Sequence, residues 1–199
     1  MSFRYVQALQ RSFSPVVRSR ILSHPSDFRS ISRDCDVFIN HRGIDTKKNV
    51  AGLLFDHLTR IGLRPFLDSK NMRPGDKLFD EIKEGIRISK IGIAVFSPRY
   101  CESYYCLHEL AMMVENKKKI IPIFVDIRPS ELHVKYSHSC PETELQRFNW
   151  ALGEAKYTVG LTFDSINGDW SKLLRKASNA VIDNLIAGEG VLMSENQAA

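Results

Sequence analysis

Six consecutive apolar residues decide the fold of this chain: Ile91-Gly92-Ile93-Ala94-Val95-Phe96. The stretch carries no charge and does not alternate with polar residues, which is typical of a parallel strand covered on both faces. Asp36–Ile39 and Ile120–Val125 have the same short, β-branched and aromatic character. Pro122 has no N–H to give to a ladder, so we expect it early in its strand. The sequence therefore predicts three core strands of one parallel sheet.

Segments with a helical repeat separate these strands. Weaker strand signals occur at Arg64–Asp68 and at Leu161–Phe163, which Gly, Pro or Asp bound. Alternating strands and helices predict an α/β fold: a flavodoxin-like, doubly wound, five-stranded parallel sheet in the order 2-1-3-4-5. The inward helix faces are expected to be Val50, Leu53, Leu54, His57, Leu58 and Ile61; Leu78, Phe79, Ile82 and Ile86; Leu107, Leu110, Ala111 and Val114; and Trp170, Leu173, Leu174, Ala177, Val181 and Leu185.

Charge and composition divide the chain into three parts. Residues 1–33 are predicted to be a disordered, basic, Arg/Ser-rich extension, since residues 1–30 hold five Arg and one Asp and so carry most of the net charge of +5. Residues 34–187 form the predicted domain, and residues 188–199 a disordered tail. We expect a cytoplasmic protein without a transmembrane segment. The alternative is that the extension is an organellar transit peptide or lies on an anionic membrane.

A ligand crevice is expected outside the carboxyl ends of the first and third strands, where the order of the sheet reverses. His41–Thr46 follows one strand and Ser97–Tyr105 follows the other. Arg42 offers a fork of donors for phosphate or carboxylate, Gly43 permits close backbone approach, and Tyr105 offers a ring for stacking. This set suits a nucleotide, although Arg42 and Gly43 could equally form a turn in which Asp45 or Thr46 caps the next helix.

The pentapeptide Cys106–Leu110 places a carboxylate, Glu109, shortly after the central strand. On a helical wheel Glu109 lies away from the apolar stripe, so spacing alone makes it a surface residue. His108 is expected at the surface as well. Glu102 and Glu115 are the nearest rival acids, and their context does not distinguish them from ordinary surface charges.

The chain resembles the Toll/interleukin receptor (TIR) domains of plants, in particular the small class with a lone TIR domain. The similarity extends over most of residues 34–187. The motifs that carry it are Asp36-Val37-Phe38-Ile39 with Arg42-Gly43 and Asp45-Thr46, then Ser97-Pro98-Arg99-Tyr100, Cys106-Leu107-His108-Glu109-Leu110 and Asp126-Ile127-Arg128-Pro129-Ser130.

The resemblance implies an NAD(P)+ nucleosidase that cleaves the nicotinamide–ribose bond and gives ADP-ribose or cyclic ADP-ribose-type products. It implies that these products promote plant defence and cell death by signalling to lipase-like immune heterodimers. NAD or NADP would be the substrate, with no cofactor. A carboxylate can stabilise the ribosyl cation that forms, and nicotinamide leaves without needing an acid. The implied site comprises the catalytic Glu109 and the substrate-binding His41, Arg42, Gly43, Ser103 and Tyr105.

The chain departs from the family at three places. His41 and Tyr105 occupy positions where Phe and Trp are usual, which weakens stacking, and Gly52-Leu53 replaces a Ser-His pair used in self-association. The resemblance still implies a homo-oligomer through TIR–TIR contacts. Two alternatives remain: a non-catalytic adaptor that acts by the same contacts, and a secondary engagement of nucleic acid through Lys117–Lys119.

Other ligand classes have little support in the sequence. Neither Gly-x-Gly-x-x-Gly after the first strand nor Gly-x-x-x-x-Gly-Lys is present. The four cysteines form no CxxC pair, and His133, His138 and Cys140 resemble a ligand cluster only loosely. We therefore expect no metal site and reduced thiols, with Cys35 and Cys106 in the core.

Overall fold

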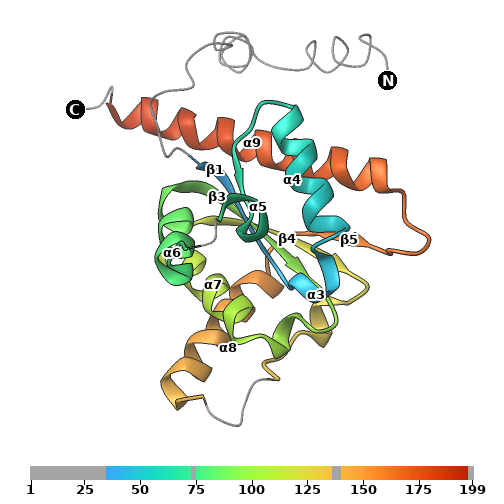
Figure 1. Ribbon diagram of the computed structural model, residues 1–199. Coiled ribbons are helices and arrows are strands. Elements are labelled where there is room, and N and C mark those ends of the chain that lie inside the picture. The colour runs from blue at the N-terminus through green and yellow to red at the C-terminus, as the bar shows by residue number, and fades with distance from the viewer. Residues whose placement is uncertain (1–34, 73–74, 136–139, 197–199) are drawn as a thin grey trace. The chain divides into compact units, whose positions relative to one another are not determined.

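The computed structural model describes residues 35–72, 75–135 and 140–196. The predicted extension at residues 1–33 lies outside these ranges. Figure 1 shows a central sheet with helices on both of its faces.

The sheet has five strands, all parallel, in the order β2-β1-β3-β4-β5, as the sequence predicts. Its centre is the pair β1–β3, which stays in register from Cys35 opposite Ser89 to His41 opposite Val95. The two strands therefore end at the same edge of the sheet. The strands are β1 (Cys35–His41), β2 (Pro65–Phe66), β3 (Ser89–Phe96), β4 (Lys119–Val125) and β5 (Leu161–Phe163).

Pro122 corrects one expectation, because it lies in the middle of β4 and not early in it. It is opposite Ala94 of β3. On the other side of β4, pairing with β5 begins only at Ile123, opposite Leu161. Residue 122 thus precedes the β4–β5 ladder, and a missing N–H costs no bond on that side.

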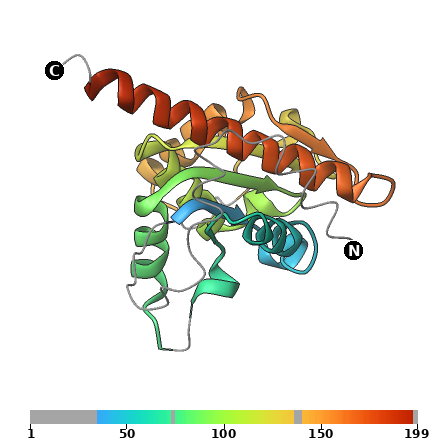
Figure 2. The ribbon, with the colours of Figure 1, turned by 90° about the horizontal axis from the view of Figure 1, so that it is seen from above.

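Helices cover both faces of the sheet, and Figures 1 and 2 show α4 and α9 on one side and α6, α7 and α8 on the other. The strand side chains alternate between these two layers. Val37, Ile93 and Ile123 pack with α4 and α9, whereas Phe38 and Phe96 pack with α6, α7 and α8. The helices are α3 (Gly43–Thr46), α4 (Val50–Arg60), α5 (Asp68–Asn71), α6 (Leu78–Ile88), α7 (Tyr104–Glu115), α8 (Glu142–Lys156) and α9 (Trp170–Asn196), with 3₁₀ turns η1 (Tyr100–Glu102) and η2 (Pro129–Glu131).

Three residues expected on inward helix faces are exposed: Leu53, Leu78 and Phe79. Each lies at the border of its apolar face, where a helix that touches the sheet along a narrow line leaves the flank in water. α9 continues as a helix beyond residue 187, where the sequence analysis places the end of the domain. Within the described ranges, no helix combines the length and the apolar character needed to cross a bilayer.

The cysteines behave as small core residues. Cys35, Cys101 and Cys106 are buried, Cys140 is half-buried, and all four are free thiols. Burial raises the pKa of Cys35 and Cys101 to about 11 and that of Cys106 to about 12, so the thiolates are suppressed. In the described part of the chain, His, Cys, Asp and Glu side chains form no cluster that could hold a metal ion.

Two glycines give a matched test of packing at the β5 edge. A Cβ at Gly160 would stand 2.6 Å from the backbone oxygen of Pro122, whereas a Cβ at Gly153 in α8 meets nothing within 4 Å. We expect Gly160→Ala to destabilise the domain by about 1–3 kcal/mol, because backbone atoms have to move. Gly153→Ala should stabilise it by roughly 0.5–1 kcal/mol through helix propensity. Urea unfolding measures both, and equal effects would contradict the close approach.

Candidate functional site

The site is built on a buried amide at the end of β1. Asn40 is fully buried, and its Nδ2 donates to Glu109 Oε2 at 2.8 Å and to the backbone oxygen of Cys106 at 3.2 Å. The hydroxyl of Tyr100 donates to Asn40 Oδ1 and also to the Cys106 oxygen at 3.1 Å. The amide thus joins β1, η1 and α7 and fixes the orientation of one carboxylate oxygen of Glu109.

Glu109 is half-buried on the first turns of α7, which differs from its position on an ideal wheel. The helix packs against both the sheet and α6, so a residue beside the apolar stripe also becomes covered. This burial raises the pKa of Glu109 to about 8. The hydrogen bond from Asn40 opposes the shift, and the negative charge of Asp68 adds to it.

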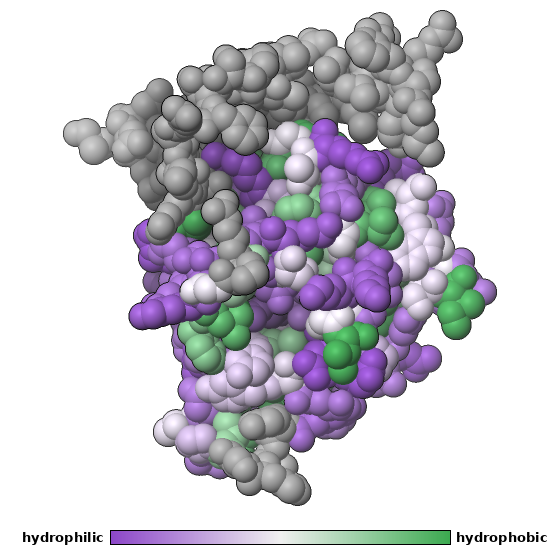
Figure 3. Space-filling model, in the orientation of Figure 1, coloured by the Kyte–Doolittle hydropathy of each residue, from purple (hydrophilic) through white to green (hydrophobic). Residues whose placement is uncertain are grey.

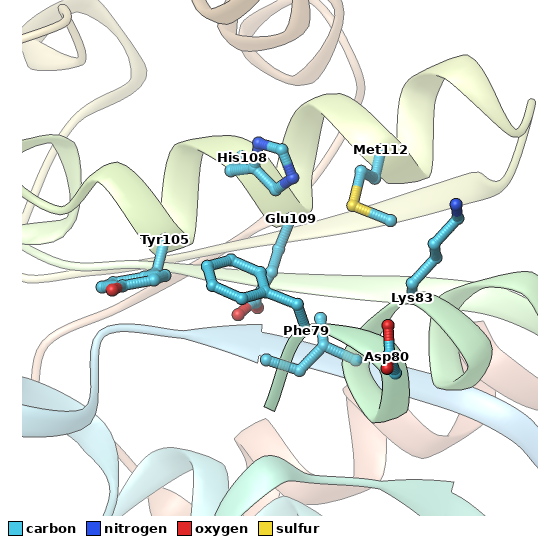
Figure 4. Close-up of a pocket in the computed structure, with 8 residues that line it drawn as sticks. Phe79, Asp80, Lys83, Tyr105, His108, Glu109 and Met112 are labelled. Carbon is cyan, nitrogen blue, oxygen red and sulfur yellow. The ribbon is translucent and has the colours of Figure 1, made fainter. Parts of the chain in front are cut away.

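A pocket of about 100 Å³ opens between α6 and α7 next to this carboxylate. Figure 4 shows the Glu109 side chain extending from α7 toward α6, on whose first turn Phe79 lies. The rings of Phe79 and Tyr105 stand 5.7 Å apart, and Tyr105 is half exposed. The residues that line the pocket are Phe79, Asp80, Ile82, Lys83, Tyr105, His108, Glu109 and Met112.

Arg42 and Ser103 meet beside the first turn of α7. Arg42 Nη1 donates to Ser103 Oγ at 3.3 Å, and the same hydroxyl accepts the N–H of Cys106 as the N-cap of the helix. The Nε of Arg42 is buried and has no hydrogen-bond partner among the described residues. A buried donor without a partner is costly, so the guanidinium of Arg42 is not fully satisfied by its contacts within the described residues.

His41 and Gly43 lie beside the crevice, but their surroundings differ from those expected of residues that contact a substrate directly. The side chain of His41 is only 3% exposed; its Nδ1 is 3.1 Å from Thr46 Oγ1 and its Nε2 is 3.4 Å from Asp68 Oδ1. A ring buried in this way has no free face for stacking. The hydrogen bond with His41 lowers the pKa of Asp68. At Gly43 an added Cβ would meet nothing closer than His41 Cε1 at 3.9 Å, so sterics do not require glycine there.

Asp45 shows that the capping interpretation of this loop is wrong. Its carboxylate does not cap a helix but accepts the Ser97 hydroxyl at 2.6 Å and the Arg99 Nε at 2.7 Å. The backbone N–H of Arg99 also donates to it, at 3.2 Å. The hydroxyl of Thr46 donates backward to the Arg42 oxygen. Asp45 therefore joins the loops after β1 and β3, the two strands at the switch point.

The predicted residues come together at one edge of the sheet, but sequence reasoning missed several others. The only feature of the sequence that points to a role for Asn40 is that it is a polar residue at the end of an apolar strand. Asp68 follows the two-residue strand β2, and its Oδ1 lies 3.4 Å from Nε2 of His41. The spacing of Phe79 predicts a core residue, whereas its side chain is exposed and lines the pocket. His108, expected at the surface, is half-buried with its ring stacked at 5.5 Å on Tyr104.

Comparisons with known proteins agree with this fold. The TIR domain family model matches residues 34–196. A Brachypodium distachyon protein named "Probable 2′ cyclic ADP-D-ribose synthase BdTIR" is 51% identical over 164 residues, which cover 80% of this chain and 73% of that protein. TMV resistance protein N of Nicotiana glutinosa is 37% identical over 141 residues, which are 63% of this chain but only 12% of that protein. Among solved structures, the TIR domains of the activated Roq1 resistosome align with a TM-score of 0.65 at 27% identity, covering 74% of this chain and 99% of that one.

The raised pKa of Glu109 has a consequence for stability. The unfolded chain releases this proton near its ordinary pKa of 4.5, whereas the folded domain keeps it up to about 8, so stability is lost as the pH rises through this window. We expect Glu109→Gln to increase the free energy of unfolding at about pH 9 by roughly 1–3 kcal/mol, and to change it little at about pH 4.5. Urea titrations of both proteins at the two pH values check this. A gain of equal size at both would show that the carboxylate is not the cause.

Proposed function

The chain belongs to the TIR domain family, and from that premise we propose that it is an NAD(P)+ nucleosidase with Glu109 as its catalytic residue. The observation that carries the proposal is the position of the Glu109 carboxylate. It lies in a pocket walled by two aromatic rings, with one oxygen held by Asn40 and the other free among the described residues. A relative that is 51% identical over 164 residues bears the name of a cyclic ADP-ribose synthase, which supports the activity in this proposal.

The chemistry needs only one carboxylate. The bond from ribose C1 to the nicotinamide nitrogen breaks, and nicotinamide departs as a neutral base with the bonding electrons. An ionised Glu109 beside C1 stabilises the cation that develops on the ribose. Attack at C1 by water gives ADP-ribose, and attack by a hydroxyl of the same molecule gives a cyclic product. Glu109 can accept the proton that the attacking oxygen loses.

The protonation state of Glu109 connects binding to reaction. With its pKa at about 8, the free site holds a neutral acid through much of the neutral range. The nicotinamide ring of NAD carries a positive charge, which favours the ionised carboxylate once the ring is beside it. Substrate binding therefore promotes the form of Glu109 that the reaction uses.

The remaining residues bind the other parts of the substrate. Phe79 and Tyr105 offer flat apolar surfaces to the nicotinamide ring. We assign the phosphates to Arg42, whose guanidinium has donors only, and to its neighbour Ser103. His41 acts indirectly, since its buried ring orients Asp68. Gly43 contributes backbone at the start of α3. No cofactor is needed, because NAD or NADP is itself consumed.

Assembly and signalling complete the proposal. We propose homo-oligomers through TIR–TIR contacts, as the Roq1 resistosome comparison supports, in a cytoplasmic protein whose products act on lipase-like immune heterodimers. The surface in Figure 3 shows apolar patches separated by polar residues. Exposed Ile44, Phe79 and Tyr105 are among the apolar residues near the site.

The first test is nicotinamide release from NAD by the concentrated protein. We expect Glu109→Ala to lower the rate by at least about 10²-fold, the usual cost of removing an electrostatic transition-state contact. Glu102→Ala, at an exposed acid of η1, is the matched control and should retain the wild-type rate. Light scattering checks that the variants assemble to the same extent as the wild-type protein. A wild-type protein that assembles but releases no nicotinamide would favour the adaptor alternative.

The pH profile tests the role assigned to Glu109. The ionised form reacts, so kcat/KM should rise with pH and level off above the pKa of the free site, at about 8. kcat should level off at lower pH, because the bound nicotinamide cation lowers this pKa. Initial rates from about pH 5.5 to 9.5 measure both curves. A fall in kcat/KM across this range would mean that the neutral acid is the active form.

A further inference from the structure

A polar network between α7 and α8 reaches the wall of the pocket. Arg147 of α8 forms a bidentate pair with Glu115, from Nε to Oε1 at 2.5 Å and from Nη2 to Oε2 at 2.8 Å. Its remaining nitrogen, Nη1, lies 3.0 Å from Nδ1 of His108 and 3.4 Å from Glu144 Oε1. The hydroxyl of Tyr104 donates to the other oxygen of Glu144 at 3.1 Å.

This network determines which ring nitrogen of His108 carries the proton. A guanidinium has donors only, so Nδ1 of His108 has to accept from Arg147 and is unprotonated. The imidazole is then neutral, with its hydrogen on Nε2. Burial and the positive charge of Arg147 both lower the pKa of His108, while Glu144, whose Oε2 lies 3.8 Å from Nδ1, and Glu115 oppose the shift.

The protonated nitrogen, Nε2 of His108, has no hydrogen-bond partner among the described residues, although His108 lines the same pocket as Glu109. The ring itself is held in place by Tyr104, stacked at 5.5 Å, and by the edge-on ring of Phe79 at 6.4 Å. Figure 4 shows His108 on the same part of α7 as Tyr105 and Glu109. The contact of Nδ1 with Arg147 therefore leaves Nε2–H as a neutral donor at the wall of the pocket.

We propose that His108 is a specificity-determining residue whose Nε2–H donates a hydrogen bond to the carboxamide oxygen of the nicotinamide group. The inference rests on the proposed function and names the contact that selects the leaving group. A flat ring bound in this pocket would lie beside two aromatic side chains, those of Phe79 and Tyr105. The pocket has few other neutral hydrogen-bond donors. A pyridine ring with a hydrogen-bond acceptor as a substituent, such as nicotinamide, fits these aromatic neighbours and the Nε2–H donor. Because His108 is neutral, it does not repel the positive charge of the nicotinamide ring. Arg147 acts through His108 and is a positioning residue.

The test compares NAD with its thionicotinamide analogue, in which sulfur, a weaker acceptor, replaces the carboxamide oxygen. For His108→Leu we expect kcat/KM for NAD to fall roughly five- to tenfold, the worth of one hydrogen bond, mainly through KM. The analogue should lose little, so the preference for NAD disappears. His108→Gln, which keeps an N–H donor at similar reach, should restore part of that preference. His133→Leu, at an exposed histidine away from the pocket, is the control and should change neither rate.

Equal losses on both substrates for His108→Leu would overturn the inference, because a purely structural role does not distinguish oxygen from sulfur. A second measurement does not depend on turnover. In Glu109→Gln protein with ¹⁵N-labelled histidine, we expect NMR to show His108 as the Nε2–H tautomer and its Nε2 resonance to shift as NAD is added. A different tautomer, or an unchanged resonance, overturns the inference. If wild type cleaves neither substrate while this resonance shifts, the proposed function fails and the contact stands.

Discussion

The hydrogen bonds of one buried amide hold the functional end of this domain together. Asn40 sits where β1 leaves the sheet, and its side chain binds Glu109, the Cys106 backbone and Tyr100 at once. All of its partners come from the segment that follows β3. The amide can reach them only because β1 and β3 run parallel in register and finish at the same edge. The parallel register of β1 and β3 therefore also fixes the position of the Glu109 carboxylate.

That constraint has an energetic cost. A carboxyl group beside an apolar pocket loses hydration, and the single amide bond compensates only part of the loss, so the proton is retained to about pH 8. Structural and chemical requirements oppose each other at Glu109, as is common at sites where reactivity depends on a poorly solvated charge. His41 and Asp68, and Arg147 and His108, repeat the arrangement on a smaller scale, with one polar group orienting the next.

Much of this arrangement could be predicted from the sequence. The strand order, the switch point and the gathering of Arg42, Ser103 and Glu109 follow from apolar runs and from parallel connections. The family resemblance, rather than periodicity, pointed to Glu109 as a candidate catalytic residue. A helical wheel assumes that a helix is buried along one face, whereas α7 packs against several elements. Asn40 was missed, and His108 was expected at the surface, for a related reason: their contacts are with partners 60 or more and 39 residues away. A pattern formed by neighbouring residues does not show which residues far apart in the sequence come into contact.

The outer strands have a consequence for how copies of the domain can meet. β2 has two residues and β5 has three, so neither border of the sheet presents a long row of unpaired backbone groups. A strand from another molecule would gain few hydrogen bonds by adding there, and cross-molecule sheet growth, the usual route to amyloid-like aggregation, is disfavoured. Association is left to side chains on helices and loops. Two copies that meet in this way can separate without breaking a continued backbone ladder.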